Sequence, residues 1–424
     1  MSDLKRAFSE DGARKTHVGG QALIEGVMMR GRYNWAVAVR EPDGGIYTEE
    51  HDLASGKDKN SWMYWPLIRG CTSLIESFAL SFKALEVATA HAYDAEGATY
   101  GNPITPEERA KMEKAEAKAR VKAEKKAARK QEREARKADR ANGPDSHSVS
   151  AEALAEDVQL AQYGKADEQS EDFAFGRTEM LVSIIIGVVM GVGIFILLPA
   201  LVANILVGEY DSNPLVWNIV DGIVRVAIFV FYIWLIGRMK DIKRMFGYHG
   251  AEHKSIHCFE HSLPMTPANA RSFPRLHVRC GTAFLIMVMI IAILVYTITP
   301  LNALIDAWGV PDGPAKFALV VVVRILLMPV IAGVSYEITV KWAGSHPDNP
   351  LVKIILWPGM QMQYLTTREP DDGQIECAIA AMQLVLAREE LEAAKAAGTE
   401  AETSEAKSAS AAAASREADG VAGL

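Results

Sequence analysis

The sequence predicts a mainly α-helical fold, a four-helix transmembrane bundle with a small N-terminal β-hairpin or sheet unit and an amphipathic helix. Two observations support this prediction. Apolar residues concentrate between about residues 180 and 340, whereas both ends of the chain are polar. The first hundred residues instead alternate apolar and polar side chains around a Pro-Asp-Gly-Gly sequence at 42–45, and this pattern is typical of antiparallel strands joined by a turn.

Two long apolar segments are free of charge and are the clearest candidates for membrane spans. Residues 180–208 and residues 280–305 contain no Asp, Glu, Lys or Arg. A helix needs about 20 apolar residues to cross the hydrocarbon core of a bilayer. Both segments therefore predict transmembrane helices.

Two further apolar segments carry charges and complete the four predicted spans. Asp221 and Arg225 lie in the segment 215–236, and Arg324 lies in the segment 317–340. Charged side chains within a membrane usually face the bundle and pair with one another. We favour a structural ion-pair network at these positions over the alternative, which is transport chemistry.

The distribution of basic residues predicts the topology. The loop between the second and third spans, residues 237–279, holds eight Lys or Arg and three Asp or Glu. Basic loops remain on the cytoplasmic side, so this loop and both termini are predicted to be cytoplasmic. The N-terminus lacks an apolar signal core, and the four cysteines show no repeated spacing, which suits a reducing compartment.

Composition divides the chain into five parts. The first part joins the predicted strands to an amphipathic helix at about 65–93, which we expect to lie on the membrane or against the bundle. The parts are a small N-terminal α+β unit (17–100), a charged linker or insertion (104–172), the four-span membrane domain (178–343), a cytoplasmic loop and helix (344–390) and a low-complexity tail (391–424). The Ala/Glu/Ser-rich tail is expected to fray.

The charged insertion has few residues that could form a core. Residues 104–141 hold fourteen Lys or Arg and eight Asp or Glu, with almost no large apolar side chain. Such a segment can be helical or disordered, but it cannot bury a core. A basic run can touch anionic lipid or RNA, yet a solvated segment is the favoured interpretation. Because the insertion is interpreted as solvated, nucleic acid is not an expected partner. The predicted partner of the chain is the lipid bilayer, which the predicted spans would cross.

A histidine-rich stretch in the cytoplasmic loop is the strongest sign of chemistry. Four of the ten histidines fall between His249 and His261. On a helix, His249 and His253 share a face, so both imidazoles can bind one metal ion. Glu252 can then act as a general base on metal-bound water, in the H-x-x-E-H order of the inverted zinc peptidases. The alternative is a set of structural histidines at a membrane boundary.

Further ligands can come from the start of the third span and from the fourth span. His277 and Cys280 precede the third span, and Glu337 lies near the inner end of the fourth. The predicted topology brings all three to the same boundary as the first two histidines. Imidazole and thiolate ligands together favour zinc. For Glu337, an ion pair with Lys341 four residues later is an equally good interpretation.

An acidic pair near the C-terminal helix permits two interpretations. Asp371 and Asp372 could bind a cation through their carboxylates. We favour the other interpretation, in which they cap a helix that begins near Gln374, because negative charge is stabilising at a helix N-terminus.

Six segments of the chain resemble a known family. They are GGQALIEGVMMRG, WPLIRG, YHGAEHKSIHCFE, HVRCGTAFL, ILLMPVIAGVSYE and LTTREPDDGQIECAIAAM. They cover about residues 17–100 and 175–390 and resemble the YqhQ-like family of bacterial membrane proteins. That family is a domain of unknown function that is labelled as a metal-dependent enzyme. The resemblance implies a multi-pass protein of the bacterial cytoplasmic (inner) membrane. The metal residues it implies here are His249, Glu252, His253, His277 and Cys280.

The residues and the resemblance together predict a metal-dependent enzyme embedded in the membrane and hydrolytic in type. Glu252 is the predicted catalytic residue. The predicted zinc ligands are drawn from His249, His253, His277, Cys280 and Glu337. The main alternative is a non-enzymatic membrane scaffold or assembly factor. A small transporter is disfavoured, because four spans are few for transport and the polar residues lie at two depths.

Overall fold

The computed structural model describes most of the chain outside the charged insertion. The described residues are 3–9, 18–53, 63, 65–94, 97–103, 105–106, 109–110, 114, 118, 177–208, 213–299, 301–311, 313–343, 346 and 349–421. Two compact units divide the chain, one made of Met1–Pro103 with Leu198–Leu424 and the other of Ile104–Leu197. The insertion predicted at 104–172 lies almost entirely outside the described residues.

An antiparallel sheet forms from the N-terminal segment, as the sequence predicts. Its strands are β1 (Gly19–Leu23), β2 (Gly26–Arg30), β3 (Asn34–Arg40) and β4 (Ile46–Asp52), paired in chain order. The Pro-Asp-Gly-Gly sequence lies in the turn between β3 and β4. The tighter turn between β1 and β2 places Glu25 at a φ of 49°.

One face of the sheet packs against helix α2 (Ile68–Ala92). Trp35, Val37 and Val39 of β3 are buried on this face together with small side chains of the helix such as Ala84. Alanines on the buried side of α2 let the helix approach the strands closely. Residues 65–93 therefore form the predicted helix, and its buried side covers the sheet.

The other face packs against α8 (Lys240–Glu260) and the start of α15 (Asp372–Val421). Ala36 and Ala38 of β3 are buried there with Tyr248 of α8. All seven residues of β3 are buried, because successive side chains of a strand point to opposite faces and both faces are covered. The sheet thus shares its core with the second half of the chain.

In the part of the chain that the structure describes, three helices are long and apolar enough to cross a membrane, by length and composition. These candidate spans are Ile185–Val207, Leu215–Ile236 and Ala318–Trp342. They correspond to α5 (Arg177–Val192) with η3 (Gly193–Leu197) and α6 (Leu198–Val207), to α7 (Pro214–Ile236), and to α12 (Pro314–Tyr336) with η5 (Glu337–Trp342). Helices of this kind indicate a membrane protein.

The apolar segment at 280–305 forms a shorter helix than the others. Helix α10 (Gly281–Ile298) has 18 residues, and α11 (Leu301–Ala307) follows it. Pro300 lies between them in the sequence and lacks the N–H that a continuous helix would need. A span of about 20 residues is usual, so a bundle of four spans is not established.

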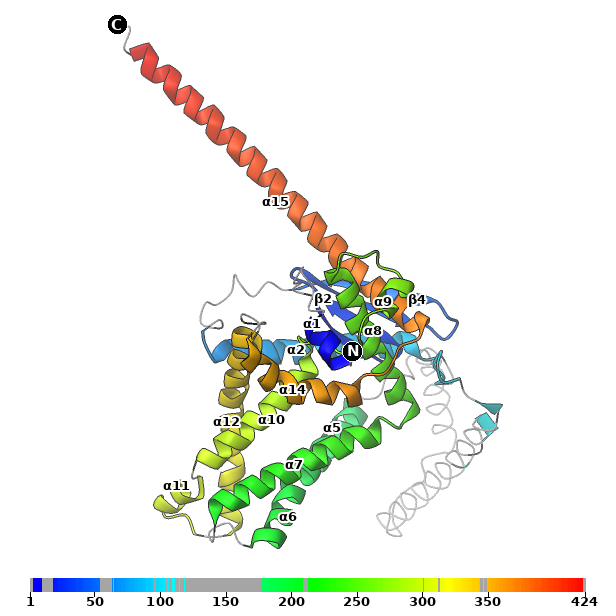
Figure 1. Cartoon of the computed structure of the whole chain (residues 1–424), viewed down its shortest axis with the longest axis vertical. Coiled ribbons are helices and arrows are strands. Elements are labelled where there is room, and N and C mark those ends of the chain that lie inside the picture. The colour runs from blue at the N-terminus through cyan, green and yellow to red at the C-terminus, as the bar shows by residue number, and fades with distance from the viewer. Residues whose placement is uncertain are drawn as a thin grey trace, which may run out of the picture. The chain divides into compact units, whose positions relative to one another are not determined.

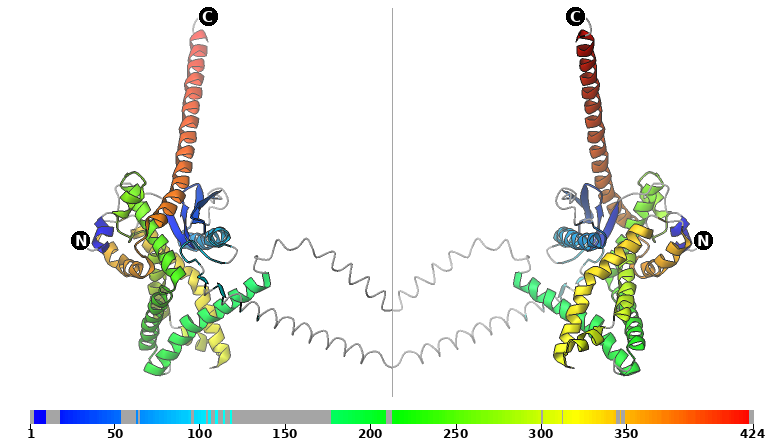
Figure 2. Two further views of the ribbon diagram at one scale, coloured as in Figure 1. Left: turned by 90° about the vertical axis from the view of Figure 1, so that its right-hand side faces the viewer. Right: turned by 90° about the vertical axis from the view of Figure 1, so that its left-hand side faces the viewer.

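Helix α10 nevertheless lies within the helical bundle. It packs against α7, α12 and α14 (Pro350–Thr366). Figures 1 and 2 show α7, α10 and α12 extending to one side of the sheet and its covering helices. Two short helices complete the fold, α1 (Asp3–Ser9) and α9 (Pro267–Arg271).

The end of the chain differs from the expectation for a low-complexity tail. Helix α15 continues through residues 391–421 to Val421, where the composition led us to expect fraying. Alanine, glutamate and lysine have high intrinsic helix propensity, and this accounts for a regular helix in this segment.

Helix α2 crosses α12 where Gly70 and Gly333 meet, and this contact is testable. A Cβ on Gly333 would lie 2.6 Å from the carbonyl oxygen of Leu67, whereas a Cβ on Gly191 would have no heavy atom within 4 Å. We expect Gly333→Ala to lower the free energy of unfolding by about 1–3 kcal/mol through overpacking. Gly191→Ala is the matched control in an apolar helix and should not lower it. Thermal unfolding of the full chain in detergent measures the stability of both variants. Equal melting temperatures for Gly333→Ala and Gly191→Ala would contradict the close crossing of α2 and α12.

Candidate metal site

Helix α8 carries the histidines through the interior of the molecule. It is buried without interruption from Gly247 to Cys258. Two glycines allow this, because a Cβ on Gly247 would collide with the side chain of Gln374, and one on Gly250 would collide with the carbonyl oxygen of Arg368. The main chain around residue 368 can therefore lie directly against the helix.

Three of the predicted ligands converge at this helix. The Nε2 atom of His249 lies 3.2 Å from the Sγ atom of Cys280. One ligand atom from each of His249, His253 and Cys280 lies within 4.8 Å of the other two. The spacing of four residues thus places both imidazoles on one face of α8, and the start of α10 brings the thiol to them. A single ion of zinc size can contact all three groups after small side-chain movements.

Main-chain carbonyl oxygens hold the two imidazoles in orientation. His249 Nδ1 donates to Thr366 O at 2.8 Å, and His253 Nδ1 donates to Arg275 O at 2.6 Å. A carbonyl oxygen only accepts, so each Nδ1 carries a hydrogen and each Nε2 is left for a ligand. Metal-binding histidines usually have this arrangement. The Nε2 atom of His253 is buried and has no hydrogen-bond partner among the described residues, so it is available to a metal ion.

The electrostatics of the group favour a thiolate. Burial by itself would raise the pKa of Cys280, but the neighbouring charges of His249 and His253 and a hydrogen bond from His249 hold it well below its usual value. Burial opposes protonation of His249, yet Cys280 raises the pKa of that imidazole to about 9. Without a metal, the two groups therefore form a thiolate–imidazolium pair near neutral pH, and a metal ion would replace the shared proton.

Glu252 lies beside this group without being one of its three members. Its side chain is buried against β1, where a Cβ on Gly20 would lie 2.9 Å from the carboxyl carbon. Burial raises the pKa of Glu252, while His253 and His249 oppose the shift. A buried carboxyl group with a raised pKa, near imidazoles and a thiol, is suited to the role of a general acid or base.

A second group of ligand-type residues lies next to the first. One ligand atom from each of His257, Glu260 and His277 lies within 4.8 Å of the other two. Arg279 already forms an ion pair with Glu260. Burial lowers the pKa of His257 to about 3 and that of His277 well below its usual value, so both rings are neutral. We interpret this group as a structural network in which the guanidinium of Arg279 supplies the cation.

The remaining predicted ligands are placed differently from one another. The ring centroid of His277 is 5.7 Å from that of His253, so His277 adjoins the first group although it belongs to the second. Glu337 belongs to neither group of described residues. Its carboxylate accepts a hydrogen bond from Arg69 Nε at 2.7 Å, and the same arginine forms an ion pair with it. The structure thus engages Glu337 with α2 rather than with the histidines.

The comparisons with known proteins agree with the motifs. Residues 65–388 match the family described as "Protein of unknown function (DUF1385)". The chain belongs to this family. It is also similar to "Uncharacterized protein YqhQ" of Bacillus subtilis (strain 168), with 27% identity over 373 residues, which cover 88% of this chain and 93% of that protein. No solved structure matches significantly.

Several residues that position the histidines of α8 were not found from the sequence. Gln363 of α14 accepts from the backbone N–H of His277 at 2.9 Å and donates to its carbonyl oxygen at 2.8 Å. Lys254 of α8 is buried and donates to the carbonyl oxygens of Arg271 and Phe273. These contacts fix the loop that precedes Cys280. Residues this far apart in sequence share no periodic pattern, so Gln363 and Lys254 could not be identified as positioning residues. Only His257 carried a signal, because it lies four residues after His253.

Asp371 of the acidic pair near α15 caps the helix, as we favoured, whereas Asp372 forms an ion pair with Arg271. Asp371 Oδ1 accepts from the backbone N–H of Gln374 at 2.8 Å, and the side chain of Gln374 accepts from the backbone N–H of Asp371 at 3.2 Å. These reciprocal bonds form a capping box. The capping interpretation is confirmed for Asp371.

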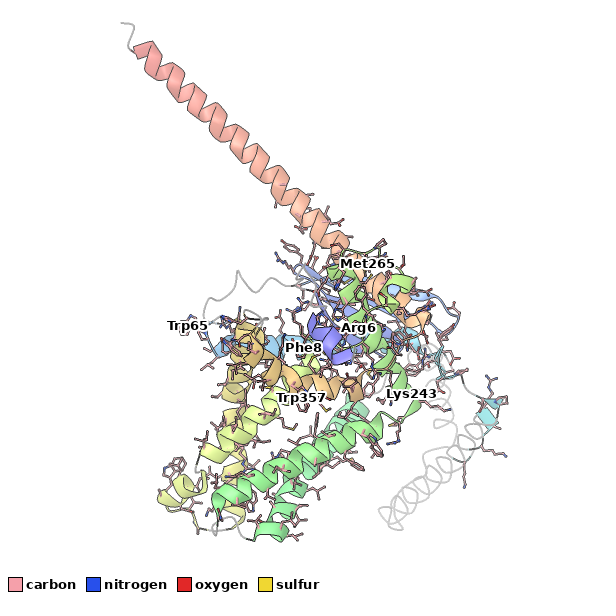
Figure 3. All side chains as sticks on the ribbon, viewed as in Figure 1. Arg6, Phe8, Trp65, Lys243, Met265 and Trp357 are labelled. Carbon is pink, nitrogen blue, oxygen red and sulfur yellow. The ribbon has the colours of Figure 1, made fainter. Side chains whose placement is uncertain are left out.

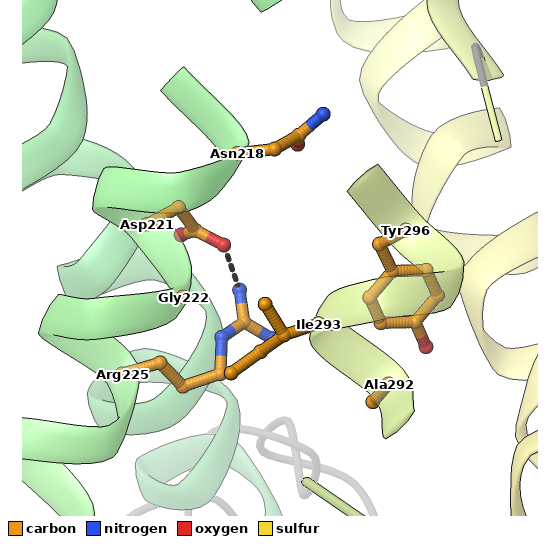
Figure 4. A pocket seen from close by; sticks show the side chains of 7 residues that line it. All are labelled: Asn218, Asp221, Gly222, Arg225, Ala292, Ile293 and Tyr296. Carbon is orange, nitrogen blue, oxygen red and sulfur yellow. Dashed lines mark hydrogen bonds and ion pairs between the residues drawn. The ribbon is translucent and has the colours of Figure 1, made fainter. Parts of the chain in front are cut away.

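Two of the three charges that we expected to form an ion-pair network pair with each other. Arg225 donates to Asp221 at 2.6 Å, one turn away on α7 (Figure 4). Arg324 lies over the ring of Tyr296 at 5.1 Å. The cavity between these side chains has a volume of about 20 Å³, which suffices for roughly one water molecule. This geometry favours the structural ion pair over a transport pathway.

The thiolate–imidazolium pair predicts an unusual pH dependence for one cysteine. In protein stripped of metal, the pKa of Cys280 lies below its ordinary value, so the thiolate persists to lower pH. We expect its alkylation by iodoacetamide to reach a plateau by neutral pH, whereas a free thiol reaches half its maximum at about pH 8.5. In His249→Ala the midpoint should move up towards that value. Peptide mass spectrometry measures the rate at Cys280, and an unchanged midpoint in the variant would contradict the pairing.

Proposed function

We propose that this chain is a metal-dependent enzyme of the bacterial inner membrane, hydrolytic in type, with zinc held by His249, His253 and Cys280. In this proposal the site lies at the cytoplasmic boundary and both termini are cytoplasmic. The observation that carries the proposal is the convergence of these three side chains, with both Nδ1 atoms already committed to carbonyl oxygens.

The number of ligands supports an enzyme over a purely structural site. Structural zinc sites use four protein ligands, whereas catalytic sites use three and leave one position open. Among the described residues, the group of His249, His253 and Cys280 has no fourth member of ligand type. Two nitrogens and one sulfur are a donor set suited to zinc rather than to magnesium or calcium.

The residues around the group suit hydrolysis. When bound, zinc would polarise a carbonyl or phosphoryl oxygen and lower the pKa of water. Glu252 would receive the proton from the attacking water and pass it to the leaving group, because burial raises its pKa. The carbonyl oxygens of Thr366 and Arg275 would keep the two imidazoles fixed during the reaction. The interior position of α8 limits the access of bulk water.

The alternative is a membrane scaffold with structural histidines. The neighbouring network of His257, His277, Glu260 and Arg279 favours it, since those imidazoles are neutral and serve packing. The two functions differ in whether the first group binds metal with an open position.

The first test measures metal. We expect about one zinc ion per chain in the purified full-length protein, and a loss of at least tenfold in affinity for His253→Ala, since a ligand is removed. His346→Ala changes an exposed histidine and is the matched control. Elemental analysis gives the stoichiometry. After exchange with cobalt, the absorption band due to thiolate coordination should disappear in Cys280→Ser. A protein without metal, or a band that survives this substitution, would support the scaffold.

The second test separates binding from catalysis. Glu252→Gln should retain zinc but lower zinc-dependent hydrolysis by roughly 10²–10⁴-fold, the usual contribution of a general base. Turnover can be measured on generic ester, amide and phosphoester substrates with fully metallated protein. Full activity in Glu252→Gln would exclude the assigned role. Inactivity of the metallated wild type towards all three classes would favour the scaffold.

A further inference from the structure

An open cleft lies at the start of α8, beside the segment that precedes α15. Its volume is about 340 Å³. Lys240, Lys243, Arg244 and Gly247 of α8 line it, together with Arg368 from the segment before α15. The four α8 positions follow a spacing of three, four and seven residues, so they form one face of the helix.

The acidic residues of the cleft already have partners. Glu369 pairs with the buried Lys254 at 3.0 Å. Asp371 caps α15 through its contact with the backbone N–H of Gln374. The charge of Glu369 is therefore balanced by Lys254, whereas Asp371 keeps its charge and lies 3.9 Å from Arg244.

The basic residues are divided into one that is paired and three that are not. Arg244 makes two hydrogen bonds with the buried Glu25, at 2.5 and 2.6 Å. Lys240, Lys243 and Arg368 have exposed side chains that form no ion pair with the described residues. The cleft thus presents three cations beside the paired Arg244, against the one remaining carboxylate of Asp371. Asp241 lies in the first turn of α8 and offsets the partial positive charge of the helix N-terminus, so the positive charge of the cleft comes from its side chains.

The cleft lies next to the end of a candidate span. Helix α7 ends at Ile236, and only Gly237, Arg238 and Met239 separate it from α8. Arg238 lies 3.4 Å above the ring of Trp234, and such aromatic and basic side chains gather at the headgroup layer of a bilayer. Figure 3 shows Lys243 at this junction of α7 and α8.

We propose that this cleft binds the phosphate of an anionic phospholipid headgroup. Two lysines and an arginine supply point charges and a planar pair of donors, which is the usual recognition of phosphate. The volume holds a headgroup, and the position beside α7 brings a lipid of the same leaflet within reach. A free phosphate compound has the same chemistry, so the two sources are separated by experiment.

The lipid site does not rest on the proposed enzyme. It shares one segment with the metal site, since Thr366 O holds His249 while Arg368, two residues later, lines the cleft. Loss of zinc binding with retained lipid binding, or the reverse, would distinguish the failure of one assignment from the failure of the other.

The experiment uses the full-length protein, delipidated in detergent and titrated with phosphatidylglycerol, phosphatidylcholine or inorganic phosphate. Native mass spectrometry counts the bound molecules. We expect one phosphatidylglycerol to bind in preference to phosphatidylcholine. Each removed cation should weaken it by about fivefold, so Lys240→Gln/Lys243→Gln should lose about 25-fold. Arg368→Gln, on a different element, should lose about fivefold.

Lys83→Gln/Lys353→Gln is the matched control, because both lysines are exposed and lie outside the cleft. It removes the same charge and should leave the affinity unchanged. Equal binding of both lipids, or equal losses in the cleft and control variants, would overturn the proposal. One bound phosphate that is lost in the cleft variant, without preference for phosphatidylglycerol, would overturn the lipid source and assign the cleft to a soluble phosphate compound.

Discussion

The structure depends on the burial of a polar helix. Helix α8 carries histidines and a lysine into the interior, and each would be costly to bury without a hydrogen-bond partner. His249, His253, Lys254 and His257 reach main-chain carbonyl oxygens in two distant segments, 271–276 and 366. These bonds satisfy the side chains of the helix and fix the two segments against it. The same contacts that stabilise the helix therefore orient the imidazoles.

The sheet contributes by covering the remaining side of this helix. Strand β1 contacts α8 and brings Gly20 against Glu252, where any side chain would overlap the carboxyl group. The buried Glu25 in the β1–β2 turn accepts two hydrogen bonds from Arg244, which anchors the start of α8. An N-terminal sheet and a helix that begins more than 180 residues after it thus form one polar interior, and the candidate metal site depends on both.

Sequence reasoning found what depends on local period and missed what depends on long-range packing. The spacing of His249 and His253 is a property of one helix, so their shared face was predictable. Cys280 could be placed from the order of the apolar segments. The partner of Glu337 was not predictable, because Arg69 comes from a helix whose crossing with α12 has no local signal. The packing of α8 and α15 on the second face of the sheet, and the carbonyl partners of the histidines, were missed for the same reason. The predicted span at 280–305 was too long because Pro300 separates α10 from α11 in the sequence.

The position of Cys280 explains why chemistry would occur at this boundary rather than deeper in the bundle. The residue directly precedes α10, and the N-terminus of a helix stabilises a thiolate beside it. Two ligands thus come from the buried α8 and the third from the entrance of an apolar helix. A metal bound by all three would cross-link these helices and lie where the sheet-and-helix layers meet the apolar bundle. In hydrocarbon the charges of such a site would be costly, whereas in bulk water the thiolate would lose the low-dielectric surroundings that strengthen its pairing. The junction between the two is the place where a thiolate, an imidazole pair and a buried carboxyl group can be kept together.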